Sequence, residues 1–258
     1  MSVAARVAAW VALAGAPALG FAQLEALPFD CDVPDALIQT EAPLPALAKR
    51  LRTDSPASIV VLGSGSSAGS GVSTPEFAYP NRLAGWLQSL FPNARLKVDV
   101  VARRGMTARD MLEALKNDIV RRRPALVVWQ TGATDAVRGV SPANFGDLLD
   151  EGIRLLHRNR IDVVLVDTQY SPYTEAFVNV GPYRDYLLWT ARRHRVPLFR
   201  RHDIMASWYE QGQFDLTSRD KTVQLRNADR IHDCLAALMS RQIGAGVKLA
   251  QDDESSRP

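Results

Sequence analysis

The chain has 258 residues, 47% of them hydrophobic, and its 31 basic and 28 acidic residues leave a formal net charge of +3. This length and composition suffice for a full hydrophobic core in one domain. The near balance of charge excludes a dominant electrostatic field. Basic clusters at 121–123, 192–195 and 200–202 come without a nucleic-acid reader motif, so we interpret them as solvated helix ends and expect no nucleic-acid partner.

The first 22 residues, MSVAARVAAWVALAGAPALGFA, contain one arginine followed by apolar and small residues. Gly20 and Ala22 supply the small residues that a signal peptidase requires before its cleavage site. We therefore expect a signal peptide over 1–22 and a periplasmic or secreted mature protein. An uncleaved N-terminal anchor is the alternative. No later segment is long and apolar enough to predict a membrane span in the mature chain.

Cys31 and Cys234 are the only cysteines. In an oxidising compartment such a pair is expected to form a disulfide. Closing a loop of about 200 residues would stabilise the fold by on the order of 4–5 kcal/mol through the entropy of the unfolded chain. The alternative is two buried free thiols. Neither cysteine has the spacing of a metal ligand, and the sequence predicts no metal site.

The elements are predicted in chain order from hydrophobic spacing and capping residues. Residues 23–57 form an irregular lead-in with a short helix over 44–52. The main domain spans 58–246 and ends in a helix that Gly244 and Gly246 terminate, and 247–258 form a disordered tail. Within the domain, strands at 58–62, 96–101, 125–130, 163–166 and 197–199 alternate with helices at 79–91, 107–122 (capped by Thr107), 142–159, 182–195 and 229–243.

Strands that are apolar throughout and alternate with helices predict a parallel sheet covered on both faces. The expected fold class is therefore α/β, with three layers around a five-stranded, mainly parallel sheet of flavodoxin-like order. In such sheets the functional groups lie beyond the carboxyl ends of the strands. The loops at 63–78, 102–107, 130–141 and 167–181 are thus the candidates for a site.

Three of these loops carry related motifs: GSGSSAG at 63–69, ARRGMT at 102–107 and QTGATD at 130–135. In this order and placement they resemble the SGNH/GDSL hydrolase family, over about 58–243. The family pattern has a Gly-Asp-Ser turn, a glycine, a Gly-x-Asn-Asp turn and an Asp-x-x-His before the last helix. The resemblance implies an ester hydrolase fold without a cofactor, in which serine attacks, histidine acts as base and aspartate orients it.

The first turn departs from the family at the attacking residue. With Gly63 and Gly69 matched to the family's glycines, Ser64 stands at the aspartate position and Gly65 at the serine position. The position of the nucleophile therefore has no side chain. Ser64 or Ser66 could replace it only if the turn were shifted by one residue.

The oxyanion groups are partly retained. Gly105 matches the second glycine, and Gly132 and Asp135 match the third motif. Thr134 replaces the asparagine, and its shorter hydroxyl is a weaker donor to an oxyanion than a carboxamide. We count Gly65, Gly105, Thr134 and Asp135 as candidate oxyanion or ligand-binding residues.

The fourth motif can be placed in two registers. The literal Asp-x-x-His pattern is Asp229 and His232, but this run has helical apolar spacing, whereas the family's pair lies in a loop. Matching the helix start instead puts Arg226 at the histidine position and Val223 at the aspartate position. We favour this second register, in which nucleophile, base, orienter and one oxyanion donor are all replaced.

The sequence is compatible with two functions, which differ in whether the chain is an enzyme. The favoured one is an exported hydrolase-family protein with a degraded catalytic set, whose cleft binds a small molecule or glycan of the carbohydrate- or acyl-ester type with Gly65, Gly105, Thr134, Asp135 and Arg226. The alternative is an active serine esterase or deacetylase that uses Ser64 or Ser66 with Asp229 and His232. A purely structural or partner-docking domain has no sequence feature of its own.

Overall fold

The protein is described by a computed structural model that covers residues 31–256. The predicted signal peptide lies outside the described residues. Five parallel strands form one sheet, in the order β2-β1-β3-β4-β5. Their bounds are β1 Ala57–Gly63, β2 Leu96–Ala102, β3 Leu126–Gln130, β4 Asp162–Val166 and β5 Leu198–Phe199. This is the flavodoxin-like strand order, so the predicted fold class is confirmed.

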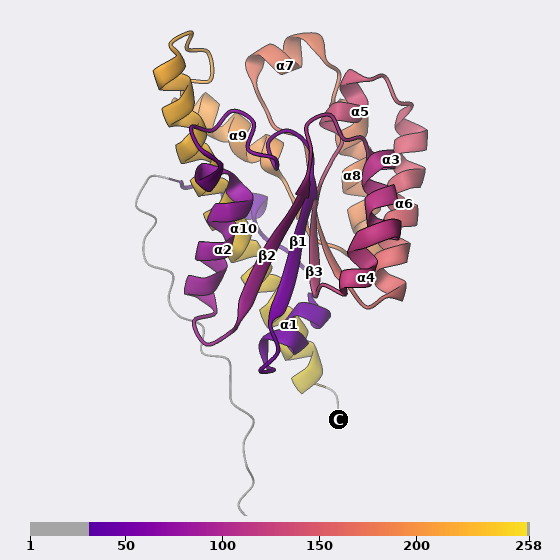
Figure 1. The fold of residues 1–258 in the computed structure, drawn as a ribbon. Helices are drawn as coiled ribbons and strands as arrows, with labels where there is room; N and C mark the ends of the chain where they lie inside the picture. The colour runs from indigo at the N-terminus through magenta and orange to yellow at the C-terminus, as the bar shows by residue number, and fades with distance from the viewer. Residues whose placement is uncertain (1–30, 257–258) are drawn as a thin grey trace, which may run out of the picture.

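Helices cover both faces of the sheet (Figure 1). One layer contains α1 (Pro45–Leu51), α2 (Tyr79–Leu90), α9 (Arg201–Glu210) and α10 (Lys221–Ser255); the other contains α3 (Ala108–Ala114), α4 (Val120–Arg122), α6 (Pro142–Arg158) and α8 (Gly181–His194). A π-helical turn, Leu115–Ile119, joins α3 to α4, and short helices α5 (Ala133–Val137) and α7 (Pro172–Phe177) follow β3 and β4. None of the helices within 31–256 is long and apolar enough to cross a bilayer.

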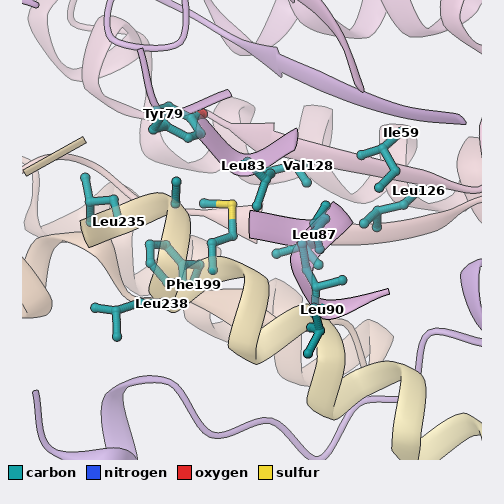
Figure 2. Packing of buried hydrophobic residues seen from close by; sticks show 14 of the residues in the cluster. Ile59, Tyr79, Leu83, Leu87, Leu90, Leu126, Val128, Phe199, Leu235 and Leu238 are labelled. Atoms are coloured by element: carbon teal, nitrogen blue, oxygen red, sulfur yellow. The ribbon is translucent and has the colours of Figure 1, made fainter. Parts of the chain in front are cut away.

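Two apolar cores lie between the sheet and its layers, because successive strand residues face opposite sides. Ile59 and Val61 of β1 contact the α2 and α10 side, whereas Val60 and Leu62 contact the α3 and α6 side. Figure 2 shows the first core, where Leu235 and Leu238 lie on α10, Leu83, Leu87 and Leu90 lie on α2, and Ile59, Leu126 and Val128 lie on the strands.

The N-terminal segment belongs to the first core. Cys31, Ile38 and Leu44 are buried in it, and Cys31 forms a disulfide with Cys234 of α10, with the two Cα atoms 5.3 Å apart. Trp208 Nε1 also donates a hydrogen bond to the carbonyl of Asp32 (3.2 Å). The lead-in is therefore part of the packed unit and not a linker to it.

The last helix is longer than predicted at both ends. It starts at Lys221, eight residues early, and continues through Gly244 and Gly246 to Ser255, so most of the expected disordered tail is helical. A Cβ at Gly244 would lie 2.7 Å from Leu90 Cδ2, and one at Gly246 would lie 2.9 Å from Leu44 Cγ. These glycines permit close packing against the α1 and α2 region, a role that resembles a helix stop when only the sequence is read.

The helix that starts after Thr107 is capped as expected. The hydroxyl of Thr107 accepts from the N–H of Asp110 (3.3 Å), and the N–H of Thr107 donates to Asp110 Oδ2 (2.8 Å). This reciprocal pair satisfies two backbone donors at the helix start. It fixes the direction in which the chain leaves the β2 loop.

Three arginines hold a left-handed backbone: Arg123 (φ 50°), Arg160 (φ 57°) and Arg195 (φ 53°). They are the only non-glycine residues of 31–256 with positive φ. Each follows the end of a helix and precedes a strand, at a position where glycine is usual. For a residue with a Cβ this conformation costs roughly 1–2 kcal/mol.

Candidate functional site

The hydroxyl of Ser64 lies at the point where the loops after β1, β2 and β3 meet. Its Oγ accepts a hydrogen bond from the Gly105 N–H (3.1 Å) and shares one with Thr134 Oγ1 (3.0 Å). Three of the residues predicted from separate motifs are thus in direct contact. Two of the groups expected to hold an oxyanion, the Gly105 N–H and the Thr134 hydroxyl, are bonded to a serine of the chain itself.

A buried network of hydrogen bonds fixes the 63–69 turn on the side of the core. Gln130 Oε1, at the end of β3, accepts from the Ser64 N–H (3.1 Å) and from Ser67 Oγ (3.0 Å), and Ser67 Oγ shares a second bond with the Tyr79 hydroxyl (2.7 Å). The network leaves no room for a side chain at Gly63, where a Cβ would lie 2.1 Å from Ser67 Oγ. Gln130, Ser67 and Tyr79 were not among the predicted site residues, although a polar residue ending the apolar run ALVVWQ was a usable signal for Gln130.

Gly65 is not required by sterics. The nearest atom to a Cβ built there is Ser70 Oγ at 3.5 Å, which is ordinary contact, and the φ of Gly65 is not positive. The Cβ of a serine would therefore fit at the position that the family pattern assigns to the nucleophile. The chain has a glycine where the backbone does not demand one.

Ser66 is held by a buried cation. Arg201 Nη1 donates to Ser66 Oγ (2.7 Å) and Nη2 donates to Gln169 Oε1 (3.0 Å), while the arginine itself is only 2% exposed. Burial lowers the pKa of Arg201, but a guanidinium has no acceptor and cannot take a proton from a hydroxyl. The contact orders the turn and does not supply a base.

The basic cluster at 200–202 is not a solvated helix end, contrary to its sequence-based interpretation. Arg201 and His202 are buried at the start of α9, where Asp167 Oδ1 accepts from the His202 N–H (2.9 Å). Burial raises the pKa of Asp167 to about 6, against the opposing effect of that hydrogen bond and of nearby Arg184. Asp167 therefore joins the end of β4 to the start of α9.

His232 lies within α10, as the sequence predicts for that run. Its Nδ1 accepts a hydrogen bond from the Tyr79 N–H (3.0 Å), and burial, with a smaller effect of Arg201, lowers its pKa to about 3. Asp229, one turn earlier, accepts from the N–H (2.8 Å) and the hydroxyl (2.6 Å) of Ser73. Within 31–256, neither residue is a hydrogen-bond partner of Ser64 or Ser66.

The favoured register for the fourth motif does not fall on a loop. Asp220 caps α10 by accepting from the N–H groups of Thr222 (2.7 Å) and Val223 (3.4 Å), so both Val223 and Arg226 are helical. Arg226 is exposed. The expectation of a loop before the helix at this point was wrong, because the capping residue Asp220 starts the helix before Val223 and Arg226.

Asp135 is fully buried and has a structural contact. Both of its carboxylate oxygens accept from the Ala108 N–H (3.1 Å each), which ties α5 to the start of α3 next to the Gly105 loop. Burial raises its pKa to about 6. Its hydrogen bonds orient the loop that carries Gly105.

Helix α7 lies beside the same edge of the sheet (Figure 1) and carries an exposed aromatic pair. Tyr173 and Phe177 are 76% and 73% exposed, and their ring centroids are 4.8 Å apart. Helix α7 is linked to α9 by a hydrogen bond between Glu175 Oε1 and His202 Nε2 (2.9 Å). Helix α7 was not predicted, although Ser171 followed by Pro172 is a usual helix start.

These contacts define what the edge can do chemically. Hydroxyl and amide groups converge on one point and could hold a carbonyl or carboxylate oxygen. An imidazole or carboxylate poised to take a proton from Ser64 is absent among the hydrogen-bond partners it has within 31–256. The same described ranges hold no cluster of His, Cys, Asp and Glu that could bind a metal ion.

Comparison with known proteins gives the family. The model of the Non-GDSL lipase-like family matches residues 30–249, while a search of curated proteins finds no match. Among solved structures, TesA is similar at 20% identity and a TM-score of 0.53, covering 70% of this chain and 99% of that one. A lipase/acylhydrolase from Enterococcus faecalis (18%, 0.59; 72% and 95%) and the acetylxylan esterase Axe2 from Geobacillus stearothermophilus (16%, 0.58; 73% and 94%) have the same fold.

Proposed function

This chain belongs to the Non-GDSL lipase-like family, and from that premise we propose that it is an exported, non-hydrolytic member that binds a carbohydrate- or acyl-ester ligand at the carboxyl edge of its sheet. The observation that carries the proposal is the state of Ser64. Its hydroxyl is bonded to the Gly105 N–H and to Thr134, and Gly65 presents no side chain to attack a carbonyl.

The missing base supports the same conclusion. Burial lowers the pKa of His232 to about 3, which makes it a weak base, and its Nδ1 accepts from the backbone N–H of Tyr79, while Asp229 is bonded to Ser73. Loss of a serine nucleophile of this type reduces kcat by about 10⁶. That corresponds to roughly 8 kcal/mol in the activation barrier, and the remaining donors do not recover it.

The ligand class follows from the groups that remain. The N–H of Gly65 has no acceptor within 31–256, and the hydroxyls of Ser64 and Thr134 can rotate toward a carbonyl oxygen. Tyr173 and Phe177 add an exposed aromatic surface of the kind that packs on sugar rings or acyl chains. The similar proteins named TesA, lipase/acylhydrolase and acetylxylan esterase make an acyl ester or an acetylated sugar the natural first ligand to test.

Export is supported by the disulfide and by the N-terminal sequence. The bond between Cys31 and Cys234 would persist in the periplasm or outside the cell, where thiols are not kept reduced. The first 22 residues have the composition of a signal peptide. A mass measurement of the N-terminus of the purified exported protein tests cleavage after Ala22.

One observation favours the alternative of an active esterase. Ser64 Oγ lies beside the two groups that would hold an oxyanion, so it is the hydroxyl best placed to attack. The test is labelling with a fluorophosphonate probe and hydrolysis of p-nitrophenyl acetate, for the wild type, Ser64→Ala and Ser66→Ala. Labelling that disappears only in Ser64→Ala would establish the enzyme and reject the proposal.

Binding is measured separately. We expect acetylated xylo-oligosaccharides or a medium-chain acyl ester to bind without turnover in isothermal titration calorimetry, and Tyr173→Ala/Phe177→Ala to weaken binding at least fivefold. Trp189→Ala, which removes a 51% exposed aromatic residue from α8, is the matched control and should leave affinity unchanged. Absence of both labelling and binding would overturn the proposal.

A further inference from the structure

A cluster of cationic side chains outside the candidate site lies at the opposite, amino edge of the sheet. A cavity of about 1080 Å³ opens there, between α1, the end of α10 and the segments that lead into β3, β4 and β5. Five cationic residues line it: Lys49, Arg50, Arg123, Arg160 and Arg195. We call this cavity the arginine pocket.

The three left-handed arginines all line the arginine pocket. They precede β3, β4 and β5, which are neighbours in the sheet, so Arg123, Arg160 and Arg195 form a row across adjacent loops. Strained backbone is retained where something else in the molecule depends on it. At all three positions the residue that replaces the usual glycine is an arginine, so each adds a guanidinium group.

Favourable interaction with helix dipoles does not explain this arrangement. The preceding helices already carry arginines in their last turns, at Arg121 and Arg122 in α4, Arg158 in α6, and Arg192 and Arg193 in α8. The left-handed position lies beyond those turns, where glycine would end the helix without strain. The arginines at this position therefore point to a use for their charge.

The cations of the pocket are not neutralised by the protein. None of the five forms a salt bridge with a carboxylate anywhere in the part of the chain that the structure describes. Of the acidic residues lining the pocket, Glu254 is paired with Arg52, and Asp162 is buried and accepts from the Leu47 N–H (2.8 Å). Glu41 and Asp253 remain, against five positive charges.

We propose that the arginine pocket is a binding site for a phosphate-bearing ligand, the phosphate being held by Arg123, Arg160 and Arg195. Guanidinium groups bind phosphate oxygens in pairs, and a ligand of two or more negative charges matches the excess of cations better than a single carboxylate does. Buried apolar residues, including Ala125, Val163 and Val196, line the same pocket and suit a small carbon skeleton attached to the phosphate.

The phosphate can belong to a free metabolite or to a lipid headgroup, and two probes separate these sources. Inorganic pyrophosphate is titrated into the full-length protein by calorimetry, and phosphatidylglycerol vesicles are compared with phosphatidylcholine vesicles by sedimentation. We expect pyrophosphate to bind and the affinity to fall with ionic strength. Binding to phosphatidylglycerol vesicles alone would assign the site to a headgroup if it has the same dependence on the three arginines.

The decisive variant is Arg123→Gly/Arg160→Gly/Arg195→Gly, in which glycine relieves the left-handed backbone while the guanidinium groups are removed. We expect at least a tenfold loss of affinity with a melting temperature equal to or above that of the wild type. The matched control is Arg121→Ala/Arg158→Ala/Arg192→Ala, which removes the same charge from neighbouring exposed positions that do not line the pocket. An equal loss in both variants, or no binding of either probe by the wild type, would overturn the proposal.

Discussion

The two edges of the sheet differ in whether their polar and charged groups are bonded to other groups of the chain. At the carboxyl edge Ser64, Gly105 and Thr134 satisfy one another, and Arg201 is bonded to Ser66 and Gln169. At the amino edge the cations of the arginine pocket have no carboxylate partner within 31–256. Hydrogen bonds within the chain stabilise the fold, whereas three of the five cations in the arginine pocket lie on left-handed backbone and are available to a ligand.

The largest expected effect is that of removing the disulfide, and it tests whether the two edges of the sheet unfold together. Replacing both cysteines (Cys31→Ala/Cys234→Ala) removes a cross-link between residues 203 apart and should lower the free energy of unfolding by about 5 kcal/mol. Urea unfolding with and without reductant measures it, and hydrogen exchange at both edges shows whether they open together. The double variant should not respond to reductant; a wild type that also fails to respond would contradict the prediction.

The second prediction concerns Asp162, the buried carboxyl at the amino edge. Burial raises its pKa to about 7, so the folded protein binds more protons than the unfolded chain between about pH 4 and 7. Its contribution to stability is therefore full below pH 4 and is lost as the pH rises through 7, by about 2–4 kcal/mol.

Asp162→Asn retains a group that can accept from the Leu47 N–H but cannot ionise. Between pH 6 and 7.5 its free energy of unfolding should fall less than that of the wild type, and above pH 7 the variant should be the more stable of the two. Asp135 and Asp167, with pKa values of about 6, account for the part of the decline that remains at lower pH. Parallel curves for the two proteins would show that Asp162 titrates normally.

The third prediction sharpens the contrast at the carboxyl edge. Gly63→Ala would place a Cβ 2.1 Å from Ser67 Oγ and 3.0 Å from Gln130 Oε1. Forcing these buried groups apart should destabilise the protein by about 2–3 kcal/mol. Gly85→Ala in α2, where a Cβ meets nothing within 4 Å, is the control and should stabilise by about 0.5–1 kcal/mol. Thermal unfolding distinguishes them, and equal effects would contradict the close packing at Gly63.

The smallest effect has the opposite sign at the amino edge. Arg160→Gly should raise the free energy of unfolding by about 0.5–1 kcal/mol, because glycine adopts positive φ without the steric cost of a Cβ. Arg158→Gly, in the last turn of α6, should lower it by about the same amount. Two losses of similar size in denaturant unfolding would show that the left-handed backbone at Arg160 carries no strain.

The regular elements were predictable where the signal was local. The five strands and most helices follow from apolar spacing, and the cap at Thr107 was found from its own residues. Helix α9 was missed because the group that satisfies its first turn is Asp167, more than thirty residues earlier and directly after β4. Gly244 and Gly246 were misread because what they contact, Leu90 and Leu44, is distant in sequence.

In the candidate site, too, features with a local sequence signal were predictable and contacts with distant residues were not. Because parallel strands end together, the order of the loops predicted that the candidate residues after β1, β2 and β3 would lie at one edge. The direct contacts of Ser64 with Gly105 and Thr134 were not predicted. The residues that hold the turn, Gln130 and Arg201, contact it from 66 and 135 positions away. The polar end of the run ALVVWQ was a local signal for Gln130, whereas no local pattern indicates the contact made by Arg201. The left-handed arginines were equally invisible, because sequence rules place glycine at such positions.

Helix α10 spans 35 residues, so at about 1.5 Å per residue its ends lie roughly 50 Å apart. Its final turns reach the arginine pocket, and Asp229 in its third turn contacts Ser73, in the loop that follows β1. Spin labels at Lys221 and Ser255 would thus be attached to the two ends of one helix of known length. A change in the distance between the labels on adding a ligand would show that the helix bends.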